Sequence, residues 1–265
     1  MEDLRSVFAG RFDKERLKVI CLDCGEHTYR EYTDDDGTVM ILPRACACRR
    51  ERAAEIARQK RIEELAVIRD RCLPSEYAKR CRFETSEETK LLLSLKRYVD
   101  AWERGAKDQV GLLLWGDVDT GKSHAAYCIA NALIEKDVSV YATQISTLAD
   151  SQFLDAYNAT RIMDRVKGCD LLILDDLGTE RETEFMTQKA FDFVNARVET
   201  GKPMIITTNL SPDVMANALD VNKKRLYSRI IGATTALEVR GKSRRAEKSR
   251  RGAEELFAII NEGGR

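Results

Sequence analysis

The chain has 265 residues, of which 43% are hydrophobic and 33% are charged, so it is long enough for one α/β domain plus a smaller module, and wholesale disorder is excluded. The 44 Lys and Arg residues balance the 44 Asp and Glu residues, which excludes a global positive charge as the basis of nucleic-acid binding. The sequence begins Met-Glu-Asp-Leu without an apolar signal segment, and no apolar run approaches the ~20 residues that cross a bilayer. We therefore expect a cytoplasmic protein with no membrane partner.

The first part of the chain contains two closely spaced pairs of cysteines, Cys21 with Cys24 and Cys46 with Cys48. Thiols stay reduced in the cytosol, so two such pairs indicate a tetrahedral Zn²⁺ site that holds together a loop-rich segment too small to bury a core. The second pair is C-x-C rather than C-x₂-C, which leaves unliganded thiols, or His27 as a substitute ligand, as alternatives. The other cysteines lack partners at ligand spacing and are predicted to be structural: Cys72, Cys81, Cys128 and Cys169. Of these, Cys128 and Cys169 are expected to lie in apolar surroundings.

Residues 49–71 are a long run of strong helix formers, in which apolar residues recur at roughly helical spacing. These apolar residues are Ile56, Ile62, Leu65 and Ile68. The spacing predicts partial burial of one helix face against a neighbour or a partner. Leu73-Pro74 ends the helix, because proline disfavours helical geometry in the residue before it. We therefore predict a zinc-binding module with its helix over residues 1–72 and a second domain over residues 73–265.

In the second domain, short apolar segments alternate with helical ones. The predicted strands are residues 110–115, 138–143, 171–174, 204–208 and 235–239. Continuous apolar strands separated by helices are typical of a parallel sheet that is buried on both faces. The fold class is therefore α/β.

A glycine-rich loop follows the first of these strands and precedes the helical residues 125–135. Its sequence fits the pattern G-x-x-x-x-G-K-[ST], with the residues Gly116, Asp117, Val118, Asp119, Thr120, Gly121, Lys122 and Ser123. Glycines let the backbone turn around anionic oxygens, and N–H groups at the helix N-terminus receive them. Lys122 is predicted to contact the β- and γ-phosphates of ATP, and the Ser123 hydroxyl to bind Mg²⁺. The carboxylates of Asp117 and Asp119 lower the expected nucleotide affinity unless they point away.

Two later strands end in polar residues. Asp175 and Asp176 follow four apolar residues, which indicates a Walker B motif: Asp175 for Mg²⁺, and Asp176 to orient or deprotonate the attacking water. Asn209 follows residues 204–208 and is the candidate sensor of the γ-phosphate, although asparagine also favours strand-ending turns.

Basic residues form a third group of candidates. Arg225 and Arg229 are four residues apart, which places them on one face of a helix. This position favours an arginine finger, a side chain that reaches the γ-phosphate bound by a neighbouring subunit. Such pairs are usually part of a solvated surface, which is the alternative. Arg244 and Arg245 are candidates for a second phosphate sensor.

Several of these segments together resemble the DnaC/DnaI/IstB group of AAA+ ATPases, over roughly residues 73–245. The segments are residues 112–116, 121–124, 130–135, 175–178 and 207–210. The chain also resembles the version from Gram-positive bacteria and their phages, in which a cysteine-rich module precedes the ATPase. The resemblance implies a P-loop NTPase (AAA+) fold, a parallel sheet flanked by helices with a small N-terminal zinc-binding module, and the cofactors ATP, Mg²⁺ and Zn²⁺.

The resemblance also implies partners and roles. Such proteins bind the replicative hexameric DNA helicase through the N-terminal part and load it onto single-stranded DNA in DNA replication, as homo-oligomers assembled with ATP and the helicase. The implied zinc ligands are Cys21, Cys24, Cys46 and Cys48. Residues 116–123, with His124, are implied to bind ATP. The implied catalytic residues are Lys122, Asp175 and Asp176, with Asn209 as sensor 1. Arg225 or Arg229 is implied to be the arginine finger, and Arg245 to be sensor 2. Asp119 replaces a glycine of the family and Asp176 a common glutamate, which predicts weaker binding and slower hydrolysis.

Two rival functions remain open. An IstB-like transposition ATPase shares the ATPase core but acts on duplex DNA with a transposase, and the cysteine-rich N-terminus argues against it. A zinc-stabilised adaptor that uses nucleotide as an assembly switch, with little hydrolysis, is kept open by Asp119.

Overall fold

The computed structural model describes residues 20–33, 35–102, 110–147, 156–178, 184–241, 252–254 and 257. The chain divides into two compact units, Met1–Ala66 and Val67–Arg265. None of the described helices is both long enough and apolar enough to cross a membrane.

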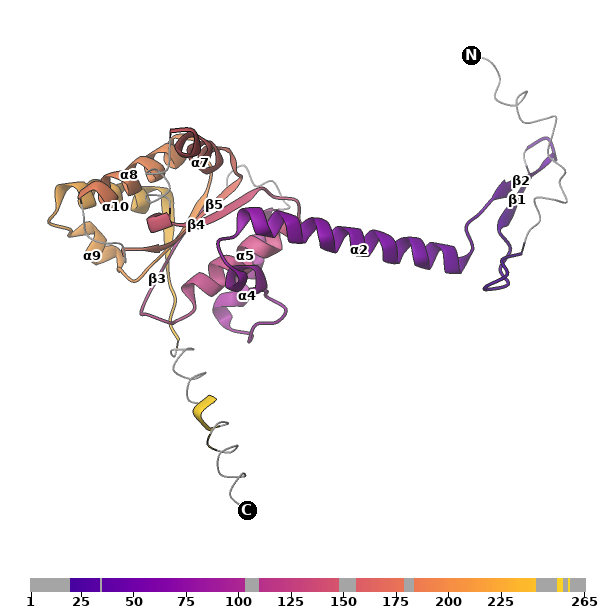
Figure 1. Cartoon of the computed structure of the whole chain (residues 1–265), viewed down its shortest axis with the longest axis horizontal. Coiled ribbons are helices and arrows are strands. Elements are labelled where there is room, and N and C mark those ends of the chain that lie inside the picture. Colours follow the sequence, from indigo (N-terminus) through magenta and orange to yellow (C-terminus); the bar gives the residue numbers. More distant parts are fainter. Residues whose placement is uncertain are drawn as a thin grey trace, which may run out of the picture. The chain divides into compact units, whose positions relative to one another are not determined.

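The first unit contains a β-hairpin in the stretch that was expected to be loop. Strands β1 (Tyr29–Thr33) and β2 (Val39–Pro43) pair antiparallel, with Tyr29 opposite Pro43 and Thr33 opposite Val39 (Figure 1). The turn between them contains Gly37 at φ 78°, a left-handed conformation that glycine adopts without steric cost. The β-branched and aromatic residues of the two short segments favour strands once this turn brings them side by side.

Helix α2 (Ala47–Cys72) confirms the predicted helix and ends directly before Leu73-Pro74. Within this chain the apolar face is covered only in part, since Leu65 is buried whereas Ile56 and Ile62 are each 52% exposed, and burial of these two against a partner stays a prediction. Helical spacing shows which side chains share a face, but whether another part of the molecule covers that face is decided by tertiary contacts.

The second unit is built on a five-stranded sheet with the order β4-β5-β6-β3-β7, in which every neighbouring pair is parallel. This confirms the predicted α/β class. The strands are β3 (Gly111–Trp115), β4 (Val140–Gln144), β5 (Leu171–Leu177), β6 (Met204–Thr208) and β7 (Thr234–Glu238). The helices are α3 (Glu76–Arg80), α4 (Lys90–Trp102), α5 (Lys122–Glu135), α7 (Ala156–Gly168), α8 (Glu184–Glu199), α9 (Pro212–Ala216) and α10 (Val221–Ala233).

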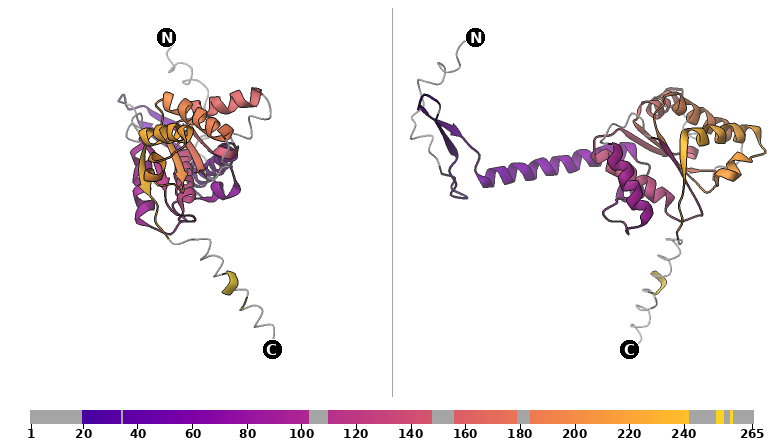
Figure 2. Two further views of the ribbon diagram at one scale, coloured as in Figure 1. Left: turned by 90° about the vertical axis from the view of Figure 1, so that its left-hand side faces the viewer. Right: turned by 180° about the vertical axis from the view of Figure 1, so that it is seen from behind.

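Helices cover both faces of this sheet. Leu113, Leu172 and Ile206 pack on one face with buried residues of α7, α8 and α10. Helix α5 packs against β3, β4, β5 and β6, and α4 packs against α5. Figures 1 and 2 show the pair α4 and α5 on the opposite side of the strands from α8 and α10. Burial on both faces explains why the strands are continuously apolar instead of alternating.

Arg197 of α8 ties together the segments that lead into β5 and β6. Its side chain is fully buried, and its guanidinium donates hydrogen bonds to main-chain carbonyl oxygens of Val166, Cys169, Asp170 and Pro203. Burial lowers the pKa of Arg197, and the carbonyl oxygens satisfy the donors that burial removes from water. The adjacent strands β5 and β6 are thus held in register at the end opposite to their polar residues.

Asn131 anchors α5 in a similar way. Its Nδ2 donates to the carbonyl oxygens of Ala78 and Cys81 at 2.8 and 2.9 Å, and its Oδ1 accepts from Arg69 Nε at 3.0 Å. The helix that carries Lys122 and Ser123 is therefore bonded to α3 and to the last turns of α2.

Candidate functional site

The glycine-rich loop lies between the carboxyl end of β3 and the start of α5. Gly116 has φ 146°, and a Cβ atom at this position would lie 2.5 Å from the carbonyl oxygen of Val239. Gly121 has φ 99° and is the residue before α5 begins at Lys122. Both positions require glycine, and the N–H groups of the first turn of α5 remain directed at the loop, as an anion site needs.

Lys122 is held over this loop. It is only 8% exposed, and its Nζ donates to the carbonyl oxygens of Gly116 at 2.9 Å and Asp117 at 2.6 Å. Burial lowers the pKa of Lys122, and the nearby carboxylates of Asp176, Asp117, Asp119 and Asp175 act in the opposite direction. The ammonium group and the carboxylates of β5 are thus close enough to interact, as the sequence predicts.

Asp119 adopts the backbone conformation of a glycine. Its φ is 62°, in the left-handed region, and its side chain is half-buried. Aspartate tolerates this conformation better than most residues, at a cost of roughly 1 kcal/mol. This position of the loop thus has a backbone conformation that glycine adopts without steric cost.

We expect an Asp119→Gly variant to bind ATP roughly five-fold more tightly, because a negative charge near the phosphates contributes about 1 kcal/mol of repulsion. The affinity is measured by fluorescence titration at low and high salt, and the gain shrinks in high salt as screening grows. Asp137→Gly is the matched control, since Asp137 has φ 60° but follows the far end of α5. Equal gains in both variants would show that the effect does not depend on a carboxylate beside the phosphates.

The sequence suggested that Asp175 and Asp176 follow a strand that ends at residue 174. In the structure both residues lie within β5. Asp175 is 4% exposed and accepts hydrogen bonds from Tyr127 Oη at 2.7 Å and Thr207 Oγ1 at 2.6 Å. Asp176 is exposed and has φ 66°, and the pairing of β5 with β6 is irregular between Leu174 and Leu177. Consecutive side chains of a strand point to opposite sides, so one carboxylate turns inward and its neighbour outward, and the two acids have different surroundings.

The polar residues gather at one edge of the sheet because β5, β6 and β3 are neighbours. Asp175 and Asp176 lie at the end of β5, exposed Asn209 follows β6, and the glycine-rich loop follows β3. In open parallel sheets, ligands bind beyond the carboxyl ends of the strands. Ser123, in the first turn of α5, and Asp175 provide a hydroxyl and a carboxylate, oxygen donors of the kind that suits Mg²⁺.

The candidate arginines lie elsewhere. Arg225 and Arg229 are exposed on α10, and the Arg225 guanidinium stacks over the ring of Phe191 at 4.9 Å. Within the described residues, neither arginine contacts the glycine-rich loop. Arg244 and Arg245 lie outside the described residues.

A pocket of about 390 Å³ borders the glycine-rich loop. It is lined by Thr120, Gly121 and His124 on one side, and by residues 87 and 89–92, Arg240 and Gly241 on the other. His124 Nε2 lies 2.7 Å from Ser86 Oγ, so the side chain is tied to the segment before α4. The size and position suit the nucleoside part of a nucleotide whose phosphates occupy the loop.

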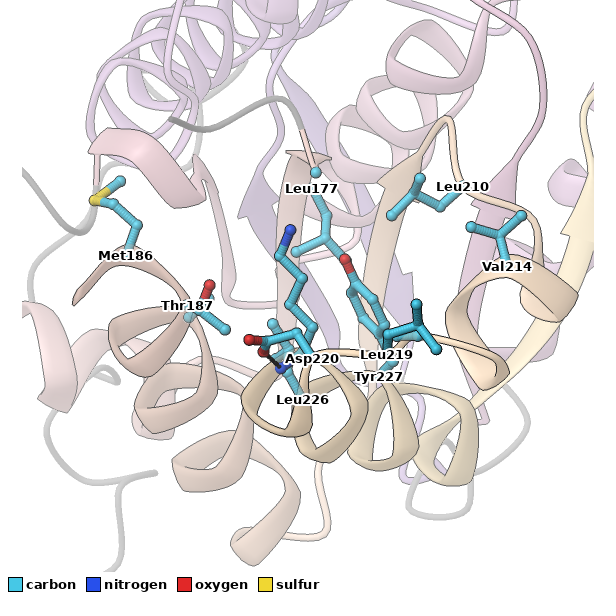
Figure 3. Close-up of a pocket in the computed structure, with 13 residues that line it drawn as sticks. Leu177, Met186, Thr187, Leu210, Val214, Leu219, Asp220, Leu226 and Tyr227 are labelled. Carbon is cyan, nitrogen blue, oxygen red and sulfur yellow. Dashed lines mark hydrogen bonds between the residues drawn. The ribbon is translucent and has the colours of Figure 1, made fainter. Parts of the chain in front are cut away.

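A second pocket, of about 360 Å³, lies beyond β5 and β6 among α8, α9 and α10. Figure 3 shows Leu177, Leu210 and Leu226 at this pocket, with Asp220 and the Tyr227 hydroxyl among its few polar groups. Its lining contains no residue of the glycine-rich loop, so we do not assign the nucleotide to it.

The four predicted zinc ligands of the first unit converge. The Sγ atoms of Cys21, Cys24, Cys46 and Cys48 all lie within 4.8 Å of one another, and Cys48 Sγ lies 3.5 Å from Cys21 Sγ and 3.3 Å from Cys46 Sγ. A tetrahedral site with Zn–S bonds of about 2.3 Å separates sulfurs by roughly 3.8 Å, so the donor set fits Zn²⁺. His27 packs edge-on against Tyr29 and is not part of this group.

The thiols of the cluster differ in acidity. Hydrogen bonds from the backbone N–H groups of Cys24 and Asp23 lower the pKa of Cys21 to about 6, whereas the neighbouring thiols raise the pKa of Cys48. Cys21 and Cys48 thus have different surroundings within the cluster, although both Sγ atoms belong to the same donor set.

The other cysteines behave as structural residues. Cys81, Cys128 and Cys169 are buried, and burial raises the pKa of Cys81 to about 11 and of Cys128 to about 12. The expectation of purely apolar surroundings is wrong for Cys128, whose Sγ lies 3.5 Å from His124 Nε2 and 3.8 Å from Ser86 Oγ. It is also wrong for Cys169, whose Sγ lies 3.6 Å from a guanidinium nitrogen of Arg197. His124 lies four residues before Cys128 on α5, a helical spacing that the sequence already contains, whereas Ser86 and Arg197 come from distant segments.

Comparison with known proteins identifies the family. Residues 35–252, more than half of the chain, match the family described as IstB-like ATP binding protein. The chain belongs to this family. It is therefore an ATP-binding AAA+ ATPase of the IstB/DnaC type, as the resemblance of its motifs implied.

Among relatives of this IstB-like chain are proteins of two kinds. It is 28% identical over 162 residues, 59% of its own length, to a protein named as an ATP-binding protein in an insertion sequence of Mycobacterium tuberculosis. It is 28% identical over 149 residues, 51% of its length, to the replicative helicase loader DnaI of Bacillus subtilis. The matched regions span 61% and 47% of these relatives, less than two thirds of either.

The fold is also found among solved structures. A crystal structure of DnaI aligns with 65% of this IstB-like chain and 95% of its own length, with a TM-score of 0.55 and 21% identity. At this identity the likeness establishes the fold alone.

Sequence reasoning missed Tyr127 and Thr207, the two hydroxyl partners of Asp175. Tyr127 lies four residues after Ser123 on the same helix, a spacing that could have placed it on the face of the Mg²⁺ site. No signal in the sequence relates either hydroxyl to a particular carboxylate oxygen.

Proposed function

We propose that this protein is an ATP-dependent loader that places a replicative hexameric DNA helicase on single-stranded DNA. The observation that carries the proposal is a four-cysteine module with an exposed apolar hairpin, which precedes an ATPase unit of the IstB/DnaC type. The likeness to the helicase loader DnaI supports it.

The docking surface that we assign to the helicase is the hairpin surface, a set of apolar side chains in the first unit. Each is at least 41% exposed, and together they are Ile20, Leu22, Tyr32, Val39, Met40 and Leu42. Exposed apolar side chains of this kind favour contact with another protein over contact with water. The basic residues of α2 are partly neutralised, since Arg58 pairs with Glu55 and Arg61 with Glu64, so α2 is a weaker candidate for phosphate binding.

In the ATPase unit, each candidate residue has a defined task. The loop around Gly116 and Gly121 binds the phosphates, and Lys122 neutralises their charge. Ser123 and Asp175 hold Mg²⁺, which withdraws negative charge from the phosphates when it is bound. Asp176 and Asn209 orient the attacking water from neighbouring strands.

Oligomerisation completes the site in this proposal. Arg225 and Arg229 are exposed on α10, so either is available to a second copy of the chain as an arginine finger. Phe191 restrains Arg225 by stacking, which lowers the entropy that the side chain loses when it engages a phosphate.

A second candidate function is a transposition ATPase that acts on duplex DNA with a transposase. The family description and the relative in an insertion sequence favour it. The hairpin surface would then contact the transposase instead of a helicase.

The deciding experiment measures complex formation and ATP turnover by the purified chain with a candidate replicative helicase, with single-stranded DNA and with duplex DNA. We expect a stable complex and turnover that is stimulated by single-stranded DNA. A Leu42→Glu variant is expected to weaken the complex at least roughly ten-fold, because burial of a leucine contributes about 2 kcal/mol.

Leu219→Glu is the matched control, because Leu219 is 99% exposed but belongs to the ATPase unit. It should bind the helicase normally. Stimulation by duplex DNA together with a transposase, and no complex with a helicase, would favour the second function. A helicase complex without measurable turnover would favour a nucleotide-switch adaptor.

A further inference from the structure

The buried carboxylate of Asp175 joins three elements of the ATPase unit. Tyr127 Oη of α5 donates to its Oδ2 at 2.7 Å, and Thr207 Oγ1 of β6 donates to its Oδ1 at 2.6 Å. We infer that Tyr127 is a positioning residue, whose hydroxyl fixes the orientation of the Asp175 carboxylate for Mg²⁺. The inference rests on the proposed role of Asp175 as a Mg²⁺ residue and not on helicase loading.

The place of Tyr127 on α5 makes this role geometrically direct. Tyr127 follows Ser123 by four residues, so the two side chains project from the same face of the helix, one turn apart. One helix therefore carries the hydroxyl proposed to bind Mg²⁺ and the hydroxyl that holds the second oxygen donor. A shift of α5 along its axis would move both together.

The ring of Tyr127 is itself well fixed. It is 3% exposed and packs edge-on against Tyr77 with ring centroids 6.3 Å apart. The carbonyl oxygen of Tyr127 accepts a hydrogen bond from Asn131 Nδ2 at 2.9 Å, so the backbone beneath the ring is also held. A hydroxyl that is fixed in this way can impose an orientation on the carboxylate that it contacts.

The chemistry of the contact allows Asp175 to bind a metal as well. Burial and the charge of Asp175 raise the pKa of Tyr127, so the phenol stays protonated and remains the donor. Each carboxylate oxygen has two acceptor positions, so one hydrogen bond per oxygen leaves room for a water molecule or an ion. Thr207 also accepts from the backbone N–H of Asp176 at 2.9 Å, which links the two acids of β5.

A purely structural role for the contact makes a different prediction. A buried tyrosine hydroxyl needs a partner, and Asp175 would supply one without any consequence for Mg²⁺. Loss of the hydroxyl would then lower stability and weaken ATP binding equally with and without Mg²⁺. Loss of a positioning contact weakens only the part of the affinity that depends on Mg²⁺.

The experiment compares ATP affinity in Mg²⁺ and in EDTA, measured with a fluorescent ATP analogue on the full chain and on a Tyr127→Phe variant. We expect Mg²⁺ to raise the ATP affinity of the wild type. In the variant, the ratio of ATP affinity in Mg²⁺ to that in EDTA should be roughly ten-fold smaller. Its affinity in EDTA should stay within about two-fold of the wild type. Tyr98→Phe is the matched control, since the Tyr98 hydroxyl donates to Val110 O at 3.0 Å, away from Asp175.

Thr207 provides an independent pair of variants. Thr207→Ser keeps the hydroxyl donor and should retain the Mg²⁺ enhancement of ATP affinity. Thr207→Val removes the hydroxyl donor and should behave like Tyr127→Phe. An unchanged enhancement in Tyr127→Phe, or an equal loss of affinity in Mg²⁺ and in EDTA, would overturn the inference. A wild type without any enhancement would overturn the role of Asp175 itself. None of these measurements involves a helicase, so a failure of the loader proposal would be a separate result.

Discussion

A Lys122→Ala variant is expected to lose ATP hydrolysis by at least roughly 100-fold, because it removes the positive charge that stabilises the transferred phosphate. In the free protein, Lys122 Nζ bonds to the carbonyl oxygens of Gly116 and Asp117, so the variant also loses the hydrogen bonds that this side chain makes to the loop. ATP affinity should therefore fall together with turnover. Both are measured on the purified chain, by fluorescence titration and by phosphate release.

Lys136→Ala is the control for Lys122, because Lys136 lies at the opposite end of the same helix. It should hydrolyse ATP at the wild-type rate. Zinc content and helicase binding in the absence of ATP should be unchanged in Lys122→Ala, since the cysteine cluster belongs to the other unit. Retention of ATP-dependent loading by this variant would contradict the proposal that the ATPase drives loading.

The second large effect is expected at the cysteine cluster. Structural zinc sites bind with about 10–16 kcal/mol, so the loss of one of four thiolates removes roughly 3 kcal/mol and weakens Zn²⁺ binding at least about 100-fold. A Cys46→Ser variant should therefore be purified almost without zinc, as measured by elemental analysis. Cys46 is fully buried, so its variant also places a poorly matched hydroxyl inside the cluster.

The consequences of zinc loss should be confined to the first unit. The hairpin β1 and β2 is too small to bury a core of its own, so it should become sensitive to proteolysis, and helicase binding should be lost. ATP affinity should stay near that of the wild type. His27→Ala tests the alternative ligand and should retain zinc. Full zinc content in Cys46→Ser would contradict the four-thiolate site.

Local patterns were enough to predict the class of the fold and to select the candidate site residues. The glycine-rich loop between an apolar strand and a helix, and the paired acids after four apolar residues, are read within short windows of sequence. The strand over residues 204–208 was predicted with the bounds that the structure has. Such patterns are reliable because their geometry depends mainly on neighbouring residues and on the burial that a parallel sheet imposes.

Contacts between distant segments could not be predicted in this way. The spacing of Ile56 and Ile62 is that of a buried face, yet both are exposed, because burial depends on what covers the helix. The hairpin in the cysteine module depends on a turn that brings two short segments together. One polar neighbour of Cys128, Ser86, lies far away along the chain.

The sequence by itself determined that this chain has a glycine-rich loop between a strand and a helix, a strand with two consecutive acids and four cysteines at ligand spacing, because each is a local arrangement of residue types. Only the tertiary structure decided that the cysteines converge without His27 and that Asp175 turns inward while Asp176 turns outward. It alone also decided that Tyr127 and Thr207 hold the inward carboxylate. The physical reason is that hydrogen bonds between side chains on different strands and helices depend on packing distances, which no single segment of the sequence specifies.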